Sequence, residues 1–166
     1  MMELRNQGLP FILPRNTASA KEGCRHLLGY DVMIEQGFHI GERDWWVMVY
    51  YDIRTERELN DAYRALLASG CDADEAQKAC MVLSGINSGY TFTDFGEHVT
   101  LMFIGKADSA EEMYNTCQHE VKHAVEHISE YYKVDSRSEE AAYLQGEISR
   151  KMFPAVAMAV CPICHE

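Results

Sequence analysis

One long helix is predicted over residues 109–132, and it carries the pattern His-Glu-x-x-His at residues 119–123. Apolar residues recur through this segment at spacings of three and four, as a single buried helix face requires. They are Met113, Cys117, Val121, Ala124 and Ile128. Residues four apart lie one turn above each other on a helix, so His119 and His123 can reach one metal ion, with Glu120 beside them. The pattern therefore predicts a Zn²⁺ site in which Glu120 lies within reach of a metal-bound water.

Three fixed positions are a weak pattern without structural context. Given the seven histidines and seventeen glutamates among 166 residues, roughly 3% of shuffled chains would contain the pattern, so its surroundings must support it. The alternative interpretation is that His119 and His123 are ordinary helix histidines and that Glu120 is a solvated side chain. A zinc hydrolase site also requires a strand leading into the motif helix and a third protein ligand on another element.

The rest of the sequence alternates between strand and helix patterns. Aromatic and β-branched runs predict strands at 32–40, 45–53, 90–94 and 98–104, the last two as a hairpin around Gly96. Capping residues and apolar spacing predict further helices at about 17–28, 55–68 and 72–83, and a last one from Ser136 or Ser138 to about 152. Pro154 is expected to end that last helix, because a proline ring blocks the preceding turn. A strand therefore leads into the motif helix, and another helix follows it after a short loop.

Length and charge limit the fold and its partners. A chain of 166 residues is expected to form one domain. Its motif-bearing core spans about 90–153, and residues 1–85 stay unassigned. The 15 basic and 26 acidic residues give a net charge of −11, and no basic cluster is present, so no nucleic-acid partner is expected. No apolar run of eighteen residues predicts a membrane span, and residues 1–14 lack the features of a secretory signal, so a cytoplasmic location is expected. Nothing in the pattern predicts an oligomeric state.

The third zinc ligand is expected downstream of the motif. The candidates are His127, Asp135, Glu139, Glu140 and Glu147. His127 lies on the motif helix itself, roughly 12 Å from His119 by helical rise, and three ligands on one straight helix cannot surround one ion. The glutamates belong to the next helix, which can fold back antiparallel and direct a carboxylate toward the metal.

A His-Glu-x-x-His helix followed by a glutamate-bearing helix resembles the gluzincin branch of the zinc metallopeptidases. Residues 139–144 are E-E-A-A-Y-L, which resembles the E-A-x-x-[FY] pattern of small bacterial and phage members. The resemblance implies Glu139 as the third ligand, with Glu140 as the alternative that thermolysin-like members favour. It also implies an α+β, zincin-like fold, in which a small twisted, mostly antiparallel sheet lies over the active-site helix. The resemblance covers about residues 98–152.

The same resemblance implies the chemistry of peptide hydrolysis. Zn²⁺ held by His119, His123 and a glutamate would lower the pKa of its bound water, and Glu120 would act as general base. An oxyanion donor is also expected, for which the candidates are Tyr143, Tyr132 and His127. In zincins the strand before the last one pairs with substrate, which here implies a peptide or protein substrate along Tyr90, Thr91, Phe92 and Thr93.

Two other functions fit the same residues. The first is a non-catalytic domain in which zinc only ties two helices together. The second is a peptide- or protein-binding module that keeps the zincin architecture but not the chemistry. Glu120→Gln would separate an enzyme from a metal-stabilised domain, because an enzyme would lose turnover and keep zinc, whereas a structural site has no activity to lose.

The C-terminal residues Cys161, Cys164 and His165 form a separate pattern, C-x-x-C-H. It is half of a zinc knuckle and a weak second metal site, because a closed zinc site takes four ligands. The pattern also matches a c-type haem attachment site, but haem is attached after export, and no export signal is present. A redox pair or a reduced tail fits the sequence better.

Overall fold

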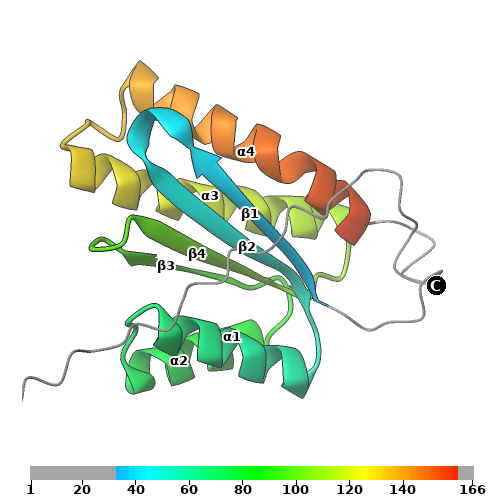
Figure 1. Cartoon of the computed structure of the whole chain (residues 1–166). Helices are drawn as coiled ribbons and strands as arrows, with labels where there is room; N and C mark the ends of the chain where they lie inside the picture. The colour runs from blue at the N-terminus through cyan, green and yellow to red at the C-terminus, as the bar shows by residue number, and fades with distance from the viewer. Residues whose placement is uncertain (1–32, 161–166) are drawn as a thin grey trace, which may run out of the picture.

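Four strands form one mixed sheet at the centre of the described chain (Figure 1). The structure is a computed structural model that describes residues 33–160. The strands are β1 (Ile34–Ile40), β2 (Trp45–Ile53), β3 (Gly89–Asp94) and β4 (Val99–Gly105), in the order β1-β2-β4-β3. The pairs β1–β2 and β3–β4 are antiparallel, whereas β2 and β4 are parallel. The predicted hairpin is confirmed, and β3 is an edge strand of the sheet.

Four α-helices accompany the sheet, and each begins at a polar cap. They are α1 (Glu56–Ala68), α2 (Ala73–Leu83), α3 (Ala110–Tyr132) and α4 (Glu139–Ala159). The caps Thr55, Asp72, Ser109 and Ser138 each accept a hydrogen bond from the backbone N–H three residues later. Such caps satisfy backbone donors that a helix start leaves unpaired, which is why these starts were predictable. A short 3₁₀ turn, η2 (Gly41–Arg43), joins β1 to β2.

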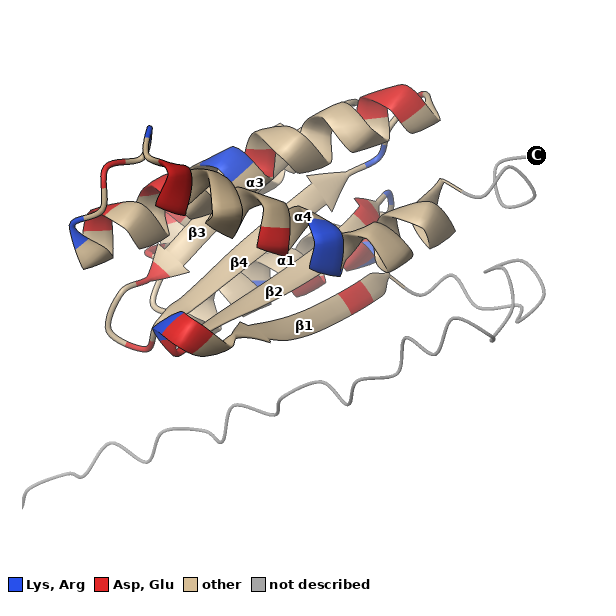
Figure 2. Ribbon diagram, turned by 90° about the horizontal axis from the view of Figure 1, so that it is seen from above, with Lys and Arg blue, Asp and Glu red and all other residues tan. Residues whose placement is uncertain are grey.

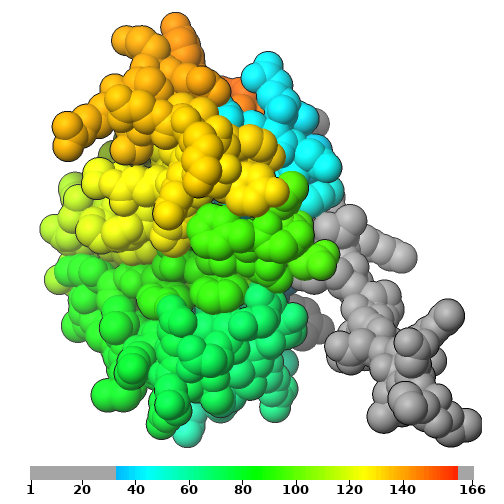
Figure 3. Space-filling model, turned by 90° about the vertical axis from the view of Figure 1, so that its left-hand side faces the viewer, coloured from blue at the N-terminus to red at the C-terminus, as the bar shows by residue number. Residues whose placement is uncertain are grey.

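The helices cover the two faces of the sheet in pairs (Figure 1), and in the space-filling view the yellow and orange residues of α3 and α4 lie on the opposite side of the molecule from the green residues of α1 and α2 (Figure 3). Helices α3 and α4 pack on one face, over a core that includes Val47, Val49 and Met102. Helices α1 and α2 pack on the other face, over a second core that includes Met48, Leu101 and Phe103. Consecutive residues of β2 and β4 thus enter opposite cores, as the alternation of side chains along a strand requires. The α+β class is therefore confirmed.

Pro154 does not end the last helix, which continues to Ala159. The prediction was wrong because tertiary packing outweighs the proline. Pro154 is exposed on the solvent side, where water can satisfy the carbonyl that loses its helical donor. Ala155, Val156 and Ala159 are buried in the core on the opposite side and keep the last turn in place.

Within residues 33–160, no helix combines the length and the apolar character needed to cross a bilayer. The helix predicted at about residues 17–28 and the C-x-x-C-H pattern lie outside the described residues.

Candidate metal centre

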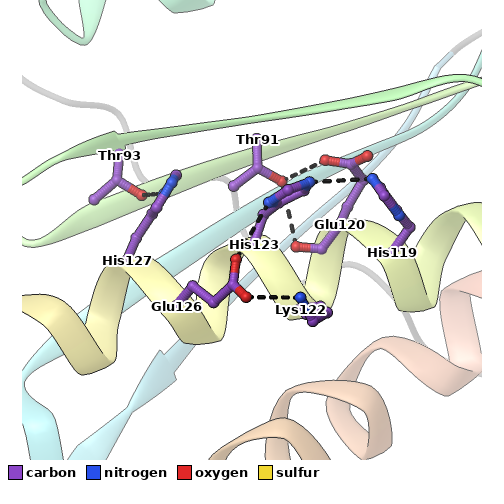
Figure 4. A network of polar contacts seen from close by, with 8 residues as sticks. All are labelled: Thr91, Thr93, His119, Glu120, Lys122, His123, Glu126 and His127. Atoms are coloured by element: carbon purple, nitrogen blue, oxygen red, sulfur yellow. Dashed lines mark hydrogen bonds and ion pairs between the residues drawn. The ribbon is translucent and has the colours of Figure 1, made fainter. Parts of the chain in front are cut away.

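Helix α3 turns one face to its core and another to the edge strand β3. Met113, Cys117, Val121 and Ile128 are buried, so the predicted apolar stripe is confirmed. The motif residues point toward the sheet edge, beneath β3 (Figure 4). Lys133 ends the helix in a left-handed conformation, and its N–H returns to carbonyls of the last turn. The motif therefore lies in the middle of a long, well-anchored helix.

His119 and His123 meet as the helical spacing predicts. Their Nε2 atoms are 3.1 Å apart, and the rings lie edge to face with centroids 4.7 Å apart (Figure 4). In a tetrahedral zinc site with Zn–N bonds of 2.0–2.1 Å, two ligand nitrogens are about 3.3–3.4 Å apart. The geometry of the pair thus fits two adjacent positions of one zinc ion.

The carboxylate of Glu126, three residues after His123, lies next to the side of the His123 ring that faces away from His119. Glu126 Oε2 is 3.6 Å from Nδ1 of His123, and Glu126 Oε1 accepts a hydrogen bond of 2.7 Å from Lys122. The Lys122 ammonium lowers the pKa of Glu126. A carboxylate on the far nitrogen of a ligand histidine commonly fixes its ring and tautomer. The sequence analysis did not single out Glu126, although its position three residues after His123 on a helix was a usable signal.

Glu120 is buried rather than solvated, with only 3% of its surface exposed. The Thr91 hydroxyl donates to its Oε2 at 2.7 Å (Figure 4). Burial raises the pKa of Glu120, while the Thr91 hydrogen bond and the nearby His123 and His119 oppose that rise. The interpretation of Glu120 as a solvated helix residue is therefore wrong.

Gly89 makes room for the Glu120 carboxylate. A Cβ atom at Gly89 would lie 2.6 Å from both Cγ and Oε1 of Glu120, closer than real Cβ atoms approach other atoms. Only glycine fits at this point of β3 while Glu120 keeps its position. Neither Gly89 nor Thr91 carries a sequence signal for this role, because the contact depends on how β3 lies over α3.

The expected third ligand is not brought to the histidine pair. Glu139 and Glu140 open α4, and both line an open groove together with Arg43, to which Glu140 is hydrogen-bonded. Ser149 Oγ donates to Gln118 Oε1 at 3.3 Å, so α4 passes the His119 turn ten residues after Glu139, or about 15 Å along the helix. Within residues 33–160, no three His, Cys, Asp or Glu side chains are placed to hold one metal ion.

Of the expected oxyanion donors, only His127 lies near the motif. Tyr143 lines the same open groove as Glu139, and 76% of its surface is exposed. The Tyr132 hydroxyl donates to the backbone carbonyl of Arg43. His127 follows His123 by one turn, and its Nδ1 is 3.0 Å from the Thr93 hydroxyl (Figure 4).

The four residues expected along the substrate divide between the two faces of β3. Thr91 and Thr93 turn toward α3, where they contact Glu120 and His127. Tyr90 and Phe92 turn the other way and pack against the second core, and the Tyr90 hydroxyl donates to Glu75 at 2.7 Å. The outer backbone edge of β3, rather than all four side chains, is therefore the element that an extended peptide could pair with.

Comparisons of the chain with family models, with curated proteins and with solved structures found no match.

Proposed function

We propose that this protein is a zinc-dependent hydrolase of peptide bonds, with His119 and His123 holding the metal and Glu120 accepting a proton. The observation that carries the proposal is the 3.1 Å approach of the two Nε2 atoms next to a buried carboxylate. A zinc ion bound there would supply a water molecule of lowered pKa. Residues 33–160 provide two of the three protein ligands usual in such sites, while Glu139 and Glu140 line the groove that also contains Arg43.

The environment of Glu120 suits a general base. Burial raises its pKa, and an acceptor whose pKa is closer to neutrality holds a proton better during a reaction near pH 7. The Thr91 hydroxyl donates to Oε2 and so favours one carboxylate orientation, for which the missing side chain of Gly89 leaves the space. The position of β3 directly above Glu120 supports a peptide bound along the strand edge, within reach of this carboxylate.

The incomplete ligand set favours a second candidate, a peptide-binding module without chemistry. In that case an extended peptide would pair with β3, and the histidine pair would bind zinc weakly or not at all. The two candidates make different predictions for the metal and for Glu120.

The deciding experiment is the metal content of protein purified without added metal. Wild type, His119→Ala and a Cys161→Ser/Cys164→Ser double variant are compared by mass spectrometry. We expect about one zinc per chain in wild type and in the cysteine variant, and none in His119→Ala. Zinc that is present in wild type, kept by His119→Ala and lost by the cysteine variant would assign the metal to the C-terminal tail. No zinc in any of the proteins would remove the basis for a hydrolase.

Turnover then separates the enzyme from a metal-stabilised domain. Zinc-loaded wild type and Glu120→Gln are incubated with fluorescein-labelled casein. We expect cleavage by wild type and a loss of at least about 100-fold in Glu120→Gln, in the range for general-base catalysts. Equal zinc content in both proteins ties the loss to proton transfer. Equal cleavage by both would show that Glu120 is not the base.

A further inference from the structure

A chain of hydrogen bonds runs from the core of the sheet to His127. Trp45 Nε1 lies 2.9 Å from Thr100 Oγ1, which lies 2.9 Å from Thr93 Oγ1, and Thr93 Oγ1 lies 3.0 Å from Nδ1 of His127. The chain crosses the sheet from β2 through β4 to the edge strand β3 and ends on α3. Trp45 and Thr100 are fully buried and Thr93 is 8% exposed, so water does not compete for the first two bonds, whereas the bond to His127 is partly buried. Glu120 takes no part in them.

The direction of these bonds follows from the donor at the buried end. A tryptophan Nε1–H can only donate, so Thr100 Oγ1 accepts from Trp45. The hydroxyl hydrogen of Thr100 then has one partner among the described residues, Thr93 Oγ1. The hydroxyl hydrogen of Thr93 in turn has Nδ1 of His127 as its partner. The reverse direction would leave the Thr100 hydrogen unpaired in a dry core, which is costly.

We propose that this relay fixes His127 as the tautomer with its proton on Nε2 and so makes it a positioned hydrogen-bond donor beside the histidine pair. Nδ1 is occupied by Thr93, and among residues 33–160 Nε2 has no hydrogen-bond partner. His127 lies one helical turn after His123, on the side of α3 that faces β3 (Figure 4). The His127 ring therefore lies next to the strand along which a peptide is proposed to bind.

The use of this donor rests on the proposed function. In a peptide hydrolase, the Nε2–H of His127 would bind a carbonyl oxygen of the substrate peptide, next to the reacting bond. The imidazole suits this task because burial and the nearby His123 lower its pKa, while Glu130 and Glu126 raise it less. A neutral ring keeps a single free donor whose direction Thr93 sets.

The test is the ¹⁵N NMR spectrum of the His127 ring in metal-free, full-length protein at pH 8. We expect two well-separated ring resonances in wild type, with the proton on Nε2 and none on Nδ1. Thr93→Val keeps the shape of the side chain but removes the hydroxyl, so both resonances should shift toward the average of the two tautomers. Thr93→Ser retains the hydroxyl and should keep the wild-type spectrum. Far-ultraviolet circular dichroism confirms that the variants fold.

Each outcome decides the proposal. A wild-type proton on Nδ1, or a Thr93→Val spectrum equal to that of wild type, overturns it. Loss of the single tautomer in Thr93→Val, together with its retention in Thr93→Ser, supports it. Because the protein is metal-free, the absence of zinc binding would overturn the proposed hydrolase function and leave this result intact.

Discussion

Glu120 is the residue whose environment has the clearest consequence for stability. It is buried with an uncharged hydroxyl as its hydrogen-bond partner, and its pKa is raised because burial penalises the charged form. A raised pKa in the folded state means that the folded protein binds this proton more tightly than the unfolded chain does. At a pH above the pKa of Glu120 in the folded protein, the ionised carboxylate therefore lowers the free energy of unfolding. This destabilisation disappears when the pH falls below the pKa of Glu120 in the unfolded chain.

Replacement of Glu120 by Gln should stabilise the metal-free protein at pH 7. The amide keeps an oxygen for Thr91 and removes a buried charge, so we expect the melting temperature to rise by at least about 2 °C. The difference from wild type should shrink toward zero as the pH falls below the ordinary pKa of 4.5, because Glu120 then becomes protonated in both the folded and the unfolded state. Thermal denaturation at the two pH values, with a chelator present, measures this difference.

Glu126→Gln is the matched control on the same helix, at a partly exposed position. The Lys122 ammonium lowers the pKa of Glu126, so its charged form stabilises the fold. Glu126→Gln should therefore lower the free energy of unfolding at pH 7 slightly, by less than about 0.5 kcal/mol, because the ion pair with Lys122 is an exposed pair on a helix. If both variants changed stability in the same direction, the raised pKa of Glu120 would not be the cause.

Gly89→Ala should destabilise the protein through Glu120. The new Cβ would lie 2.6 Å from Glu120 Oε1, and forcing a buried side chain aside typically costs about 1–3 kcal/mol. Urea denaturation of Gly89→Ala, Glu120→Ala and the double variant should reveal coupling, because the methyl group fits once the carboxylate is gone. Gly146→Ala, where the new Cβ meets nothing within 4 Å on exposed α4, should instead be neutral or stabilising.

Residue-level prediction succeeded where the signal was local. The approach of His119 and His123 follows from their spacing on one helix, and it needs no knowledge of the rest of the fold. The burial of Glu120 depends on Gly89 and Thr91, which lie about thirty residues away and contact it only because β3 crosses α3 at that point. Neither residue type indicates such a contact by itself.

The starts of the helices were predictable from their capping residues. The ends of the helices and the way in which they align along one another were less predictable. Thr55 and Glu58 form the capping box that their spacing predicts. The placement of α4 beside α3 depends on which apolar residues face each other, and that register places Glu139 at the far end of α3 from His119. A short motif in α4 cannot encode this register, so the third ligand inferred from resemblance did not reach the histidine pair.

Pro154→Ala tests how packing holds the last turns of α4. The helix continues through Pro154 although the ring removes one backbone hydrogen bond, so restoring that bond should stabilise the protein by about 1–2 kcal/mol. The increase should appear as a higher midpoint of urea denaturation. Phe153→Ala, at a side chain 68% exposed, is the neighbouring control and should change stability little. A lower midpoint of urea denaturation in Pro154→Ala would indicate instead that the packing of the last turns of α4 depends on the proline.

At the scale of the whole molecule, the order of the strands was not predictable from the chain. Local patterns identify β2 and β4 as apolar strands, but their parallel pairing arises because α1, α2 and β3 lie between them in sequence. The pairing buries both strands between two helical layers. It also leaves β3 at the edge, directly over the motif face of α3, and this arrangement makes the proposed site possible.

The net charge of −11 should make the stability of the whole molecule depend on salt at pH 7. Acidic residues are spread over the ribbon with few basic residues among them (Figure 2), so folding brings like charges together. Raising the ionic strength from 0.01 to 0.15 M shortens the Debye length from about 30 to about 8 Å, so the melting temperature should rise by a few degrees. Near pH 5.5, close to the isoelectric point of about 5.0, the same salt step should have a much smaller effect, because little net repulsion remains to be screened. An equal shift at both pH values would assign the salt effect to solvation of apolar surface instead of charge repulsion.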